Sequence, residues 1–120
     1  MKQPDAQHPI TLSALGQRLV VTWKGLVVAQ SDQVLSLQEA TYPAVLYVPR
    51  ADIIEAHFQR TDRSTHCPYK GDASYYSLTG GGATDENAVW SYEAPYPAIA
   101  EIQGYVAFYP DRVSFALTPL

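Results

Sequence analysis

Apolar and polar residues alternate along much of this chain with a period of two, which is the pattern of half-buried β-strands. Leu19, Val21 and Trp23 lie on one face of a strand predicted over residues 18–23. Lys24-Gly25, which follows directly, predicts a tight turn. Further segments of strand length and pattern cover residues 26–29, 34–39, 45–48, 74–78, 88–92, 105–109 and 112–117.

The connections between these segments predict how the strands are paired. Residues 18–39 contain two short reversals, so we expect a three-stranded meander. Gly80-Gly81-Gly82 predicts a flexible hairpin connection, and Pro110-Asp111 predicts a second hairpin near the end of the chain. The pattern therefore favours antiparallel sheets.

Two short segments carry helix signals. Asp52 followed by Glu55 has the spacing of a capping box, which predicts a helix over residues 53–58. A second helix of at most two turns is predicted between Pro97, which suits a first turn, and Gly104, which suits a C-terminal cap.

These elements predict a mainly β fold: a single compact domain of about eight short strands, barrel-like or a sandwich, with one or two short helices. Residues 1–14 include Pro4 and Pro9 and show no sustained period, so we expect a mobile N-terminal arm or an extended edge segment before a domain over residues 15–120. Residues 59–72 have no apolar period and are predicted to be irregular.

Composition narrows the classes of partner. The chain has 120 residues, of which 47% are hydrophobic and 17% charged, with a net charge of -4. An acidic domain lacks the basic surface that binds nucleic acid or anionic membranes, so we expect neither partner. The apolar runs are far shorter than a membrane span, and the single cysteine, Cys67, suits a reducing compartment. The sequence therefore predicts a cytoplasmic protein.

Residues 65–72 hold the highest density of reactive side chains: a thiol, an imidazole, a phenol, an amine and a carboxylate. Cys67 and Lys70 are the catalytic candidates, although Cys67 also fits a small buried apolar residue and Asp72 fits a partner for Lys70. No metal site is expected, because the adjacent His66 and Cys67 would bind one ion awkwardly.

The same segment predicts a binding site for a small polar or anionic ligand. Lys70 is one of only three lysines, and Arg50 is the expected second cation. Nine tyrosines are about twice the usual number, and tyrosine favours hydrogen-bonding pockets. The predicted ligand-binding residues are Tyr47, Arg50, His66, Tyr69, Lys70, Asp72 and Tyr92.

Several segments resemble one known family in order along the chain. They are Thr-His-Cys-Pro-Tyr-Lys-Gly-Asp-Ala-Ser-Tyr at 65–75, Trp-Lys-Gly at 23–25, Tyr-Val-Pro-Arg at 47–50 and Ala-Val-Trp-Ser-Tyr at 88–92. This pattern is similar to domain-of-unknown-function family 427, which also carries a nucleotidyltransferase-like label. The resemblance implies a small β-rich single domain from chiefly bacterial and fungal proteins without an agreed substrate. Nucleotidyl transfer uses paired carboxylates, and Asp85-Glu86 is the only adjacent acidic pair.

Three functions remain open from the sequence. The first is a domain that binds a small ligand in a polar, tyrosine-lined pocket, with its cofactor requirement unknown. The second is an enzyme that uses Lys70 or Cys67, as the transferase label suggests. The third is a protein-interaction module that receives a partner at an exposed strand edge or aromatic patch. A homo-oligomer is compatible with all three.

Overall fold

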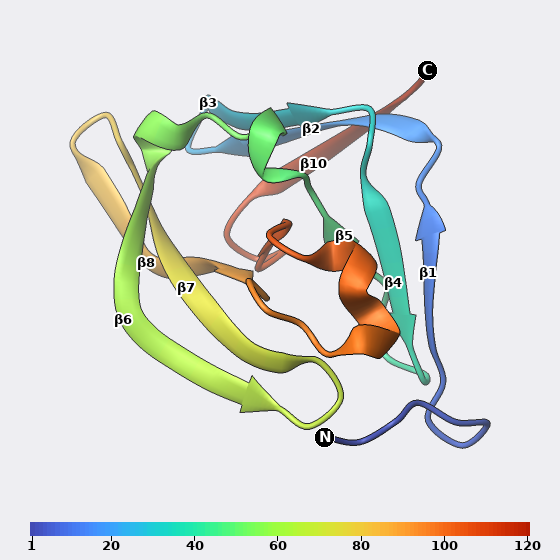
Figure 1. The fold of residues 1–120 in the computed structure, drawn as a ribbon. Helices are drawn as coiled ribbons and strands as arrows, with labels where there is room; N and C mark the ends of the chain where they lie inside the picture. The colour runs from blue at the N-terminus through green and yellow to red at the C-terminus, as the bar shows by residue number, and fades with distance from the viewer.

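A computed structural model describes residues 1–120 and consists mainly of β-strands (Figure 1). The strands are β1 (Ile10–Ala14), β2 (Gln17–Trp23), β3 (Leu26–Ser31), β4 (Leu35–Glu39), β5 (Val45–Tyr47), β6 (Phe58–Cys67), β7 (Gly71–Gly80), β8 (Ala83–Ser91), β9 (Val106–Phe108) and β10 (Ser114–Pro119). The helical elements are three 3-10 segments, η1 (Arg50–Asp52), η2 (Glu55–His57) and η3 (Pro97–Ile102). The predicted mainly β class of a single domain is confirmed.

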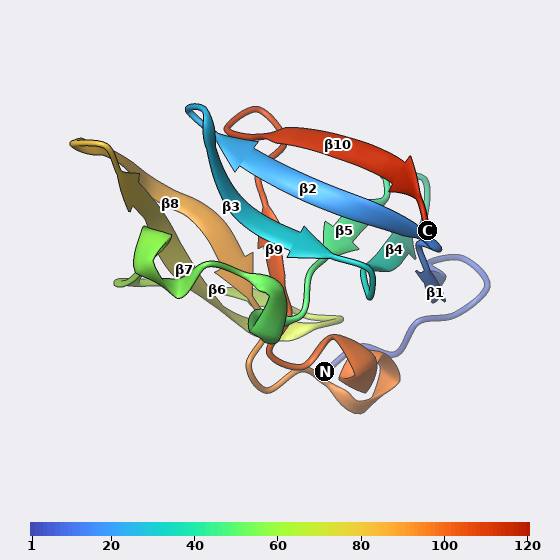
Figure 2. The same cartoon turned by 90° about the horizontal axis from the view of Figure 1, so that it is seen from above.

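The strands form three antiparallel sheets, with the orders β1-β4-β5, β10-β2-β3 and β6-β7-β8-β9. In Figure 1 these sheets lie along three sides of the molecule, and Figure 2 shows the β10-β2-β3 sheet as a layer of its own. A single bridge between Val48 and Val106 joins the ends of β5 and β9. The prediction left a barrel-like form and a sandwich open, and the three sheets do not close into a barrel.

Two of the predicted strand pairings are wrong. β4 pairs with β1 and β5, so residues 18–39 do not form a three-stranded meander. The reason is that the chain crosses between layers near Val34, which packs in one core while Leu37 packs in another. Likewise, β9 pairs with β8 and β10 pairs with β2, so the two segments around Pro110-Asp111 do not form a hairpin.

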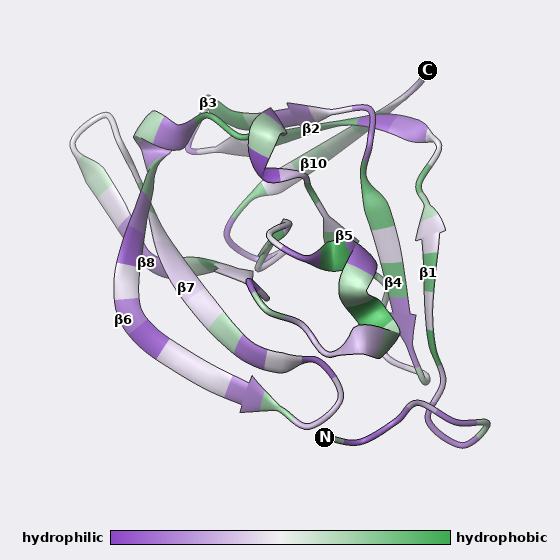
Figure 3. Cartoon of the chain, viewed as in Figure 1, coloured by the Kyte–Doolittle hydropathy of each residue, from purple (hydrophilic) through white to green (hydrophobic).

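The predicted irregular stretch over residues 59–72 is also wrong, because most of it is strand β6. This strand pairs with β7 and is an edge of the four-stranded sheet. No residue of β6 is fully buried, and Figure 3 shows it as mostly hydrophilic along its length. A strand without a buried face carries no apolar alternation, which is why the sequence pattern does not reveal it.

The predicted helix over residues 53–58 is replaced by η1 and η2, on either side of an extended Ile53. The capping box does not form. The Asp52 carboxylate accepts a hydrogen bond from the Ser31 hydroxyl at 2.6 Å, and Glu55 pairs with Arg50 instead.

The second predicted helix is present as η3, which is a kinked 3-10 segment with Pro97 in its first turn. Gly104 follows in the left-handed conformation, with φ +74°, which glycine adopts without strain. Near the N-terminus, residues 10–14 form the edge strand β1, which corresponds to the extended edge segment considered for residues 1–14.

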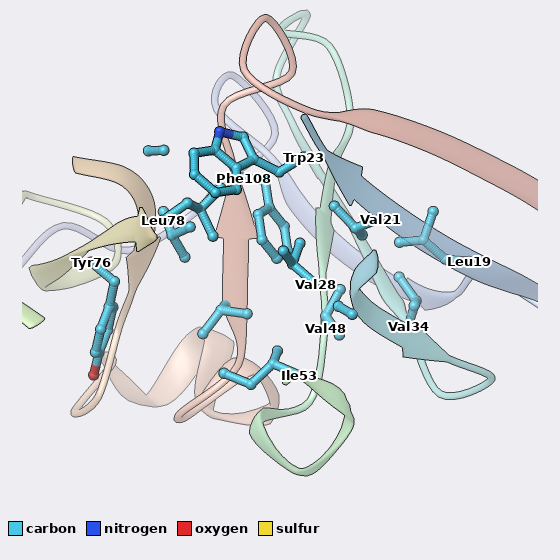
Figure 4. Close-up of a cluster of buried hydrophobic side chains, with 14 residues drawn as sticks. Leu19, Val21, Trp23, Val28, Val34, Val48, Ile53, Tyr76, Leu78 and Phe108 are labelled. Atoms are coloured by element: carbon cyan, nitrogen blue, oxygen red, sulfur yellow. The ribbon is translucent and has the colours of Figure 1, made fainter. Parts of the chain in front are cut away.

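Two hydrophobic cores hold the layers together. The first lies between the β10-β2-β3 sheet and the β7-β8-β9 strands, and Figure 4 shows its side chains, among them Trp23, Leu78 and Phe108. The second core lies beside η3 and is rich in tyrosine. Its buried members are Leu37, Tyr47, Ala73, Tyr75, Tyr92, Ile99, Ile102 and Ala107.

Candidate functional site: a tyrosine-lined cavity

The second core contains a cavity of about 270 Å³. Strands β4, β5, β7 and β8 supply its walls, together with the connections that follow β4, β6, β8 and β9. It is lined by Leu37, Glu39, Tyr42, Pro43, Val45, Tyr47, Lys70, Tyr75, Trp90, Tyr92 and Tyr109. Six aromatic rings and one pair of opposite charges therefore surround a single space, which we call the tyrosine cavity.

The alternation of strand side chains explains why these residues meet. Leu37 and Glu39 are two positions apart on β4, so they project from the same face of that strand. Val45 and Tyr47 stand in the same relation on β5, which is paired directly to β4. Trp90 reaches the cavity from β8. The polar tips of Glu39 and Tyr47 thus project among apolar side chains.

One end of the tyrosine cavity is formed by an ion pair. The Lys70 ammonium donates a hydrogen bond to one oxygen of the Glu39 carboxylate, and His8 Nε2 lies 2.8 Å from the other oxygen. Burial raises the pKa of Glu39, but the hydrogen bonds from Lys70 and His8 outweigh it and hold the pKa below its ordinary value. Lys70 is 8% exposed, and its Nζ also lies 3.5 Å from Cys67 Sγ.

Two tyrosine hydroxyls in the cavity have unused hydrogen-bonding capacity. Trp90 Nε1 donates to the Tyr47 hydroxyl oxygen at 3.3 Å, while the phenol proton of Tyr47 has no acceptor. The Tyr92 hydroxyl has no hydrogen-bond partner, although the residue is only 7% exposed. Burial raises the pKa of both phenols far above the ordinary range, so both present O–H donors to the cavity.

Tyr75 and Tyr109 form another wall of the cavity. The Tyr75 hydroxyl lies 2.9 Å from Thr65 Oγ1, and the Arg63 guanidinium lies over its ring, 4.9 Å from the centroid. Burial raises the pKa of Tyr75, yet hydrogen bonds from Thr65, Tyr109 and Arg63 bring it below the ordinary value. For Tyr109, burial and the neighbouring Tyr75 raise the pKa.

The structure brings together three of the seven residues predicted to bind ligand: Tyr47, Lys70 and Tyr92. Arg50 lies outside the cavity, where it pairs with Glu55 at 2.6 Å and donates to the Tyr76 hydroxyl at 2.8 Å.

The other three predicted residues also lie outside the cavity. His66 and Asp72 pair with each other at 2.8 Å on the exposed hairpin of β6 and β7. Tyr69 stacks on His8 with ring centroids 4.0 Å apart. Consecutive residues of this segment point in different directions, so its density in sequence does not become a single site.

Of the two catalytic candidates, only one lines the tyrosine cavity. Lys70 lines it, whereas Cys67 is half-buried next to Lys70 and does not line it. Asp85 and Glu86, the adjacent acidic pair, do not act together: Asp85 accepts hydrogen bonds from Trp23 and Arg112, while Glu86 is exposed. No group of three or more His, Cys, Asp or Glu side chains is arranged to hold a metal ion.

The sequence reasoning missed several cavity residues, of which Glu39 is chemically the most important. One signal could have identified it: the alternation of Leu35, Leu37 and Glu39 places this carboxylate on the apolar face of its strand. The other aromatic residues that it missed are Tyr42, Tyr75, Trp90 and Tyr109, and the aliphatic ones are Leu37, Pro43 and Val45.

A family model described as a domain of unknown function (DUF427) matches residues 11–118, nearly the whole chain. No curated protein matches. The matching description assigns no activity. The structure contains no helix that is both long and apolar enough to cross a membrane.

Proposed function

We propose that this chain, which belongs to the family described as a domain of unknown function (DUF427), binds a small molecule in the tyrosine cavity. The observation that carries the proposal is the Tyr92 hydroxyl. Tyr92 is 7% exposed and lines the cavity, and its hydroxyl donates no hydrogen bond within the chain, so its O–H is a free donor at the cavity wall. A ligand acceptor atom in the cavity would satisfy it.

The free donors define one end of the ligand. The phenol protons of Tyr47 and Tyr92 lack acceptors, and the Lys70 ammonium has three protons, of which Glu39 accepts one and Cys67 Sγ, at 3.5 Å, is a weak acceptor for another. Donors of this kind suit a carboxylate, a monoanionic phosphate ester or a polarised carbonyl. Because Glu39 already balances the charge of Lys70, the cavity suits a single negative charge better than a polyphosphate. This argument supports a small, polar or anionic ligand.

The walls define the rest of the ligand. Trp90 and Tyr109 have ring centroids 4.7 Å apart, and they face the same space as Tyr42 and Pro43. Aromatic walls with a few polar groups at one end are typical of sites for small organic molecules. The ligand that fits has a flat or apolar body and one acceptor group.

Among the alternatives, binding is favoured over catalysis by the state of Lys70. A nucleophilic lysine needs an environment that disfavours its charged form, whereas the Glu39 carboxylate beside Lys70 stabilises the ammonium. Lys70 acts better as a charged hydrogen-bond donor to a ligand.

A binding measurement on matched variants tests the proposal. Benzoate, phenyl phosphate and inorganic phosphate are titrated by calorimetry and thermal shift against the wild type and the variants Tyr92→Phe, Lys70→Met and Tyr69→Phe. Benzoate carries one acceptor group on one flat ring and has no flexible chain, so it tests the tyrosine cavity alone. A ligand that binds only the folded state raises the melting temperature, because it adds RT ln(1 + [L]/Kd) to the free energy of unfolding.

We expect benzoate or phenyl phosphate to bind and Tyr92→Phe to weaken the affinity about tenfold or more, as loss of a hydrogen bond to a charged group does. Tyr69→Phe is the matched control, because this hydroxyl lies outside the cavity, and it should leave the affinity unchanged. Equal affinity in the wild type and Tyr92→Phe, or no binding of any probe, would overturn the proposal.

A further inference from the structure

A second cavity, of about 520 Å³, adjoins the tyrosine cavity. No charged residue lines it, and we call it the apolar cleft. Its lining consists of Tyr42, Pro43, Ala44, Val45, Leu46, Trp90, Phe108, Pro110 and Phe115. A concave and mainly apolar space of this size on a small domain is a candidate site for an apolar group of a ligand.

Four residues line both spaces: Tyr42, Pro43, Val45 and Trp90. The two cavities therefore meet at the start of β5, with Trp90 between them. Beyond the other end of β5, a single bridge between Val48 and Val106 joins the chain to β9. Leu46 lines only the apolar cleft and Tyr47 only the tyrosine cavity, and neighbours on a strand point to opposite faces, so past Val45 the two spaces lie on the two sides of β5.

We propose that the ligand is an elongated amphiphile, whose acceptor group lies in the tyrosine cavity and whose apolar tail passes Trp90 into the apolar cleft. This inference rests on the function proposed above and names its ligand class: a monocarboxylate or similar head on a flexible hydrocarbon tail. The free donors of Tyr47, Tyr92 and Lys70 take the head. The uncharged lining takes the tail.

The chemistry of the two spaces favours one ligand over two separate ones. The charged groups, Glu39 and Lys70, line only the tyrosine cavity, while no charged residue lines the cleft. A tail in the cleft would cover Phe115, which is 37% exposed on the edge strand β10. Burial of an apolar tail in the cleft should therefore make the binding free energy more favourable for a ligand that extends from one space into the other.

The test is a series of straight-chain carboxylates from butanoate to decanoate, titrated into the wild type by calorimetry. Burial of each methylene in the cleft should tighten Kd about fourfold until the cleft is filled. The indole N–H signals of the protein in an ¹⁵N-correlated spectrum give an independent readout. The signal of Trp90 should shift with the longer tails, while that of Trp23, which donates to Asp85, should not.

Two neighbouring positions on β10 supply a matched pair of variants. Phe115 lines the cleft, whereas Leu117, two residues later and 46% exposed, lines neither cavity. Phe115→Ser should flatten the dependence of Kd on tail length, and Leu117→Ser should leave it intact. Ala44→Glu, which places a charge at an exposed position of the cleft, is the second variant and should also flatten it.

The outcomes separate the two proposals. If benzoate binds through Tyr92 but Kd does not change with tail length, the amphiphile inference is wrong and the proposed function stands. If no probe binds, both are wrong. If Phe115→Ser converts an associated wild type into a monomer in sedimentation equilibrium without changing the tail-length dependence, the cleft is a contact between two copies of the chain, and the inference is again overturned.

Discussion

The Lys70 ammonium and the Glu39 carboxylate are 31 positions apart in sequence and form an ion pair at the polar end of the tyrosine cavity. Their side chains are 10% and 17% exposed, so both charges are largely removed from water. A pair in such surroundings adds little net stability when complete, but loss of one partner leaves the other charge uncompensated. The pair therefore makes this end of the cavity polar. Because Glu39 is titratable, the pair also makes the stability of the protein depend on pH.

Glu39→Gln should lower the free energy of unfolding by roughly 2 kcal/mol at pH 7, because Lys70 is left without its carboxylate. Since the pKa of Glu39 is held below its ordinary value, its contribution to stability is present above about pH 4.5 and is lost as the pH falls through the folded-state pKa. Urea denaturation of wild type and variant from pH 7 to pH 3 measures the difference, which should shrink below pH 4.5. A difference that stays constant over this range would contradict the prediction.

The buried phenols of Tyr47 and Tyr92 should lower the stability of the protein at alkaline pH. Their pKa values are raised in the folded state, so the unfolded chain loses these two protons first and stability falls as the pH rises above about 10. In a spectrophotometric titration, two of the nine tyrosines should ionise only together with unfolding. Ionisation of all nine in a folded protein would contradict this. The double variant Tyr47→Phe/Tyr92→Phe should shift the alkaline unfolding midpoint upwards.

Several of the strands predicted correctly from the sequence have one buried face. Leu19, Val21 and Trp23 are fully buried on one side of β2, and this asymmetry is what the alternation records. β6 was not predicted because its residues are mostly polar and show no alternation, whereas β10, which is also exposed, keeps Phe115 and Leu117 on one face. The capping box at Asp52 did not form because its two carboxylates have other partners: Ser31, on strand β3, donates to Asp52, and the nearby Arg50 pairs with Glu55.

The site was predicted in part for a related reason. Lys70 stood out by its scarcity and local setting, and Tyr47 and Tyr92 came from the abundance of tyrosine together with the family resemblance. Arg50 carries the charge expected of an anion-binding residue, but its position is decided by Tyr76 and Glu55, which nothing in the local pattern around Arg50 indicates. The cavity forms where strands that are distant in sequence pair with one another. Such pairings cannot be predicted from the local pattern of a single sequence.

The turn between β7 and β8 provides a test of packing at a glycine. A Cβ on Gly80 would lie 2.8 Å from Leu26 Cδ1 and 2.9 Å from His57 Nδ1, which also lies 2.8 Å from the Thr79 carbonyl oxygen. Gly80→Ala should therefore lower the free energy of unfolding by about 2–3 kcal/mol. Gly81→Ala, where nothing lies within 4 Å and only the left-handed backbone opposes the change, should cost about 1 kcal/mol in urea denaturation. Equal effects would show that packing at Gly80 is unimportant.

Removal of the Tyr92 hydroxyl should leave the protein as stable as before or more stable by up to about 1 kcal/mol, because this hydroxyl makes no hydrogen bond within the chain and its residue is only 7% exposed. Tyr76→Phe is the matched control: Tyr76 is equally buried, but its hydroxyl accepts a hydrogen bond from Arg50 at 2.8 Å and donates to Glu93 at 3.2 Å. That variant should lose about 1–2 kcal/mol in urea denaturation. A gain in stability at Tyr92 together with weaker ligand binding is the trade-off expected of a functional residue. A loss at Tyr92 as large as that at Tyr76 would show instead that the Tyr92 hydroxyl serves the fold, and would remove the main support for the ligand site.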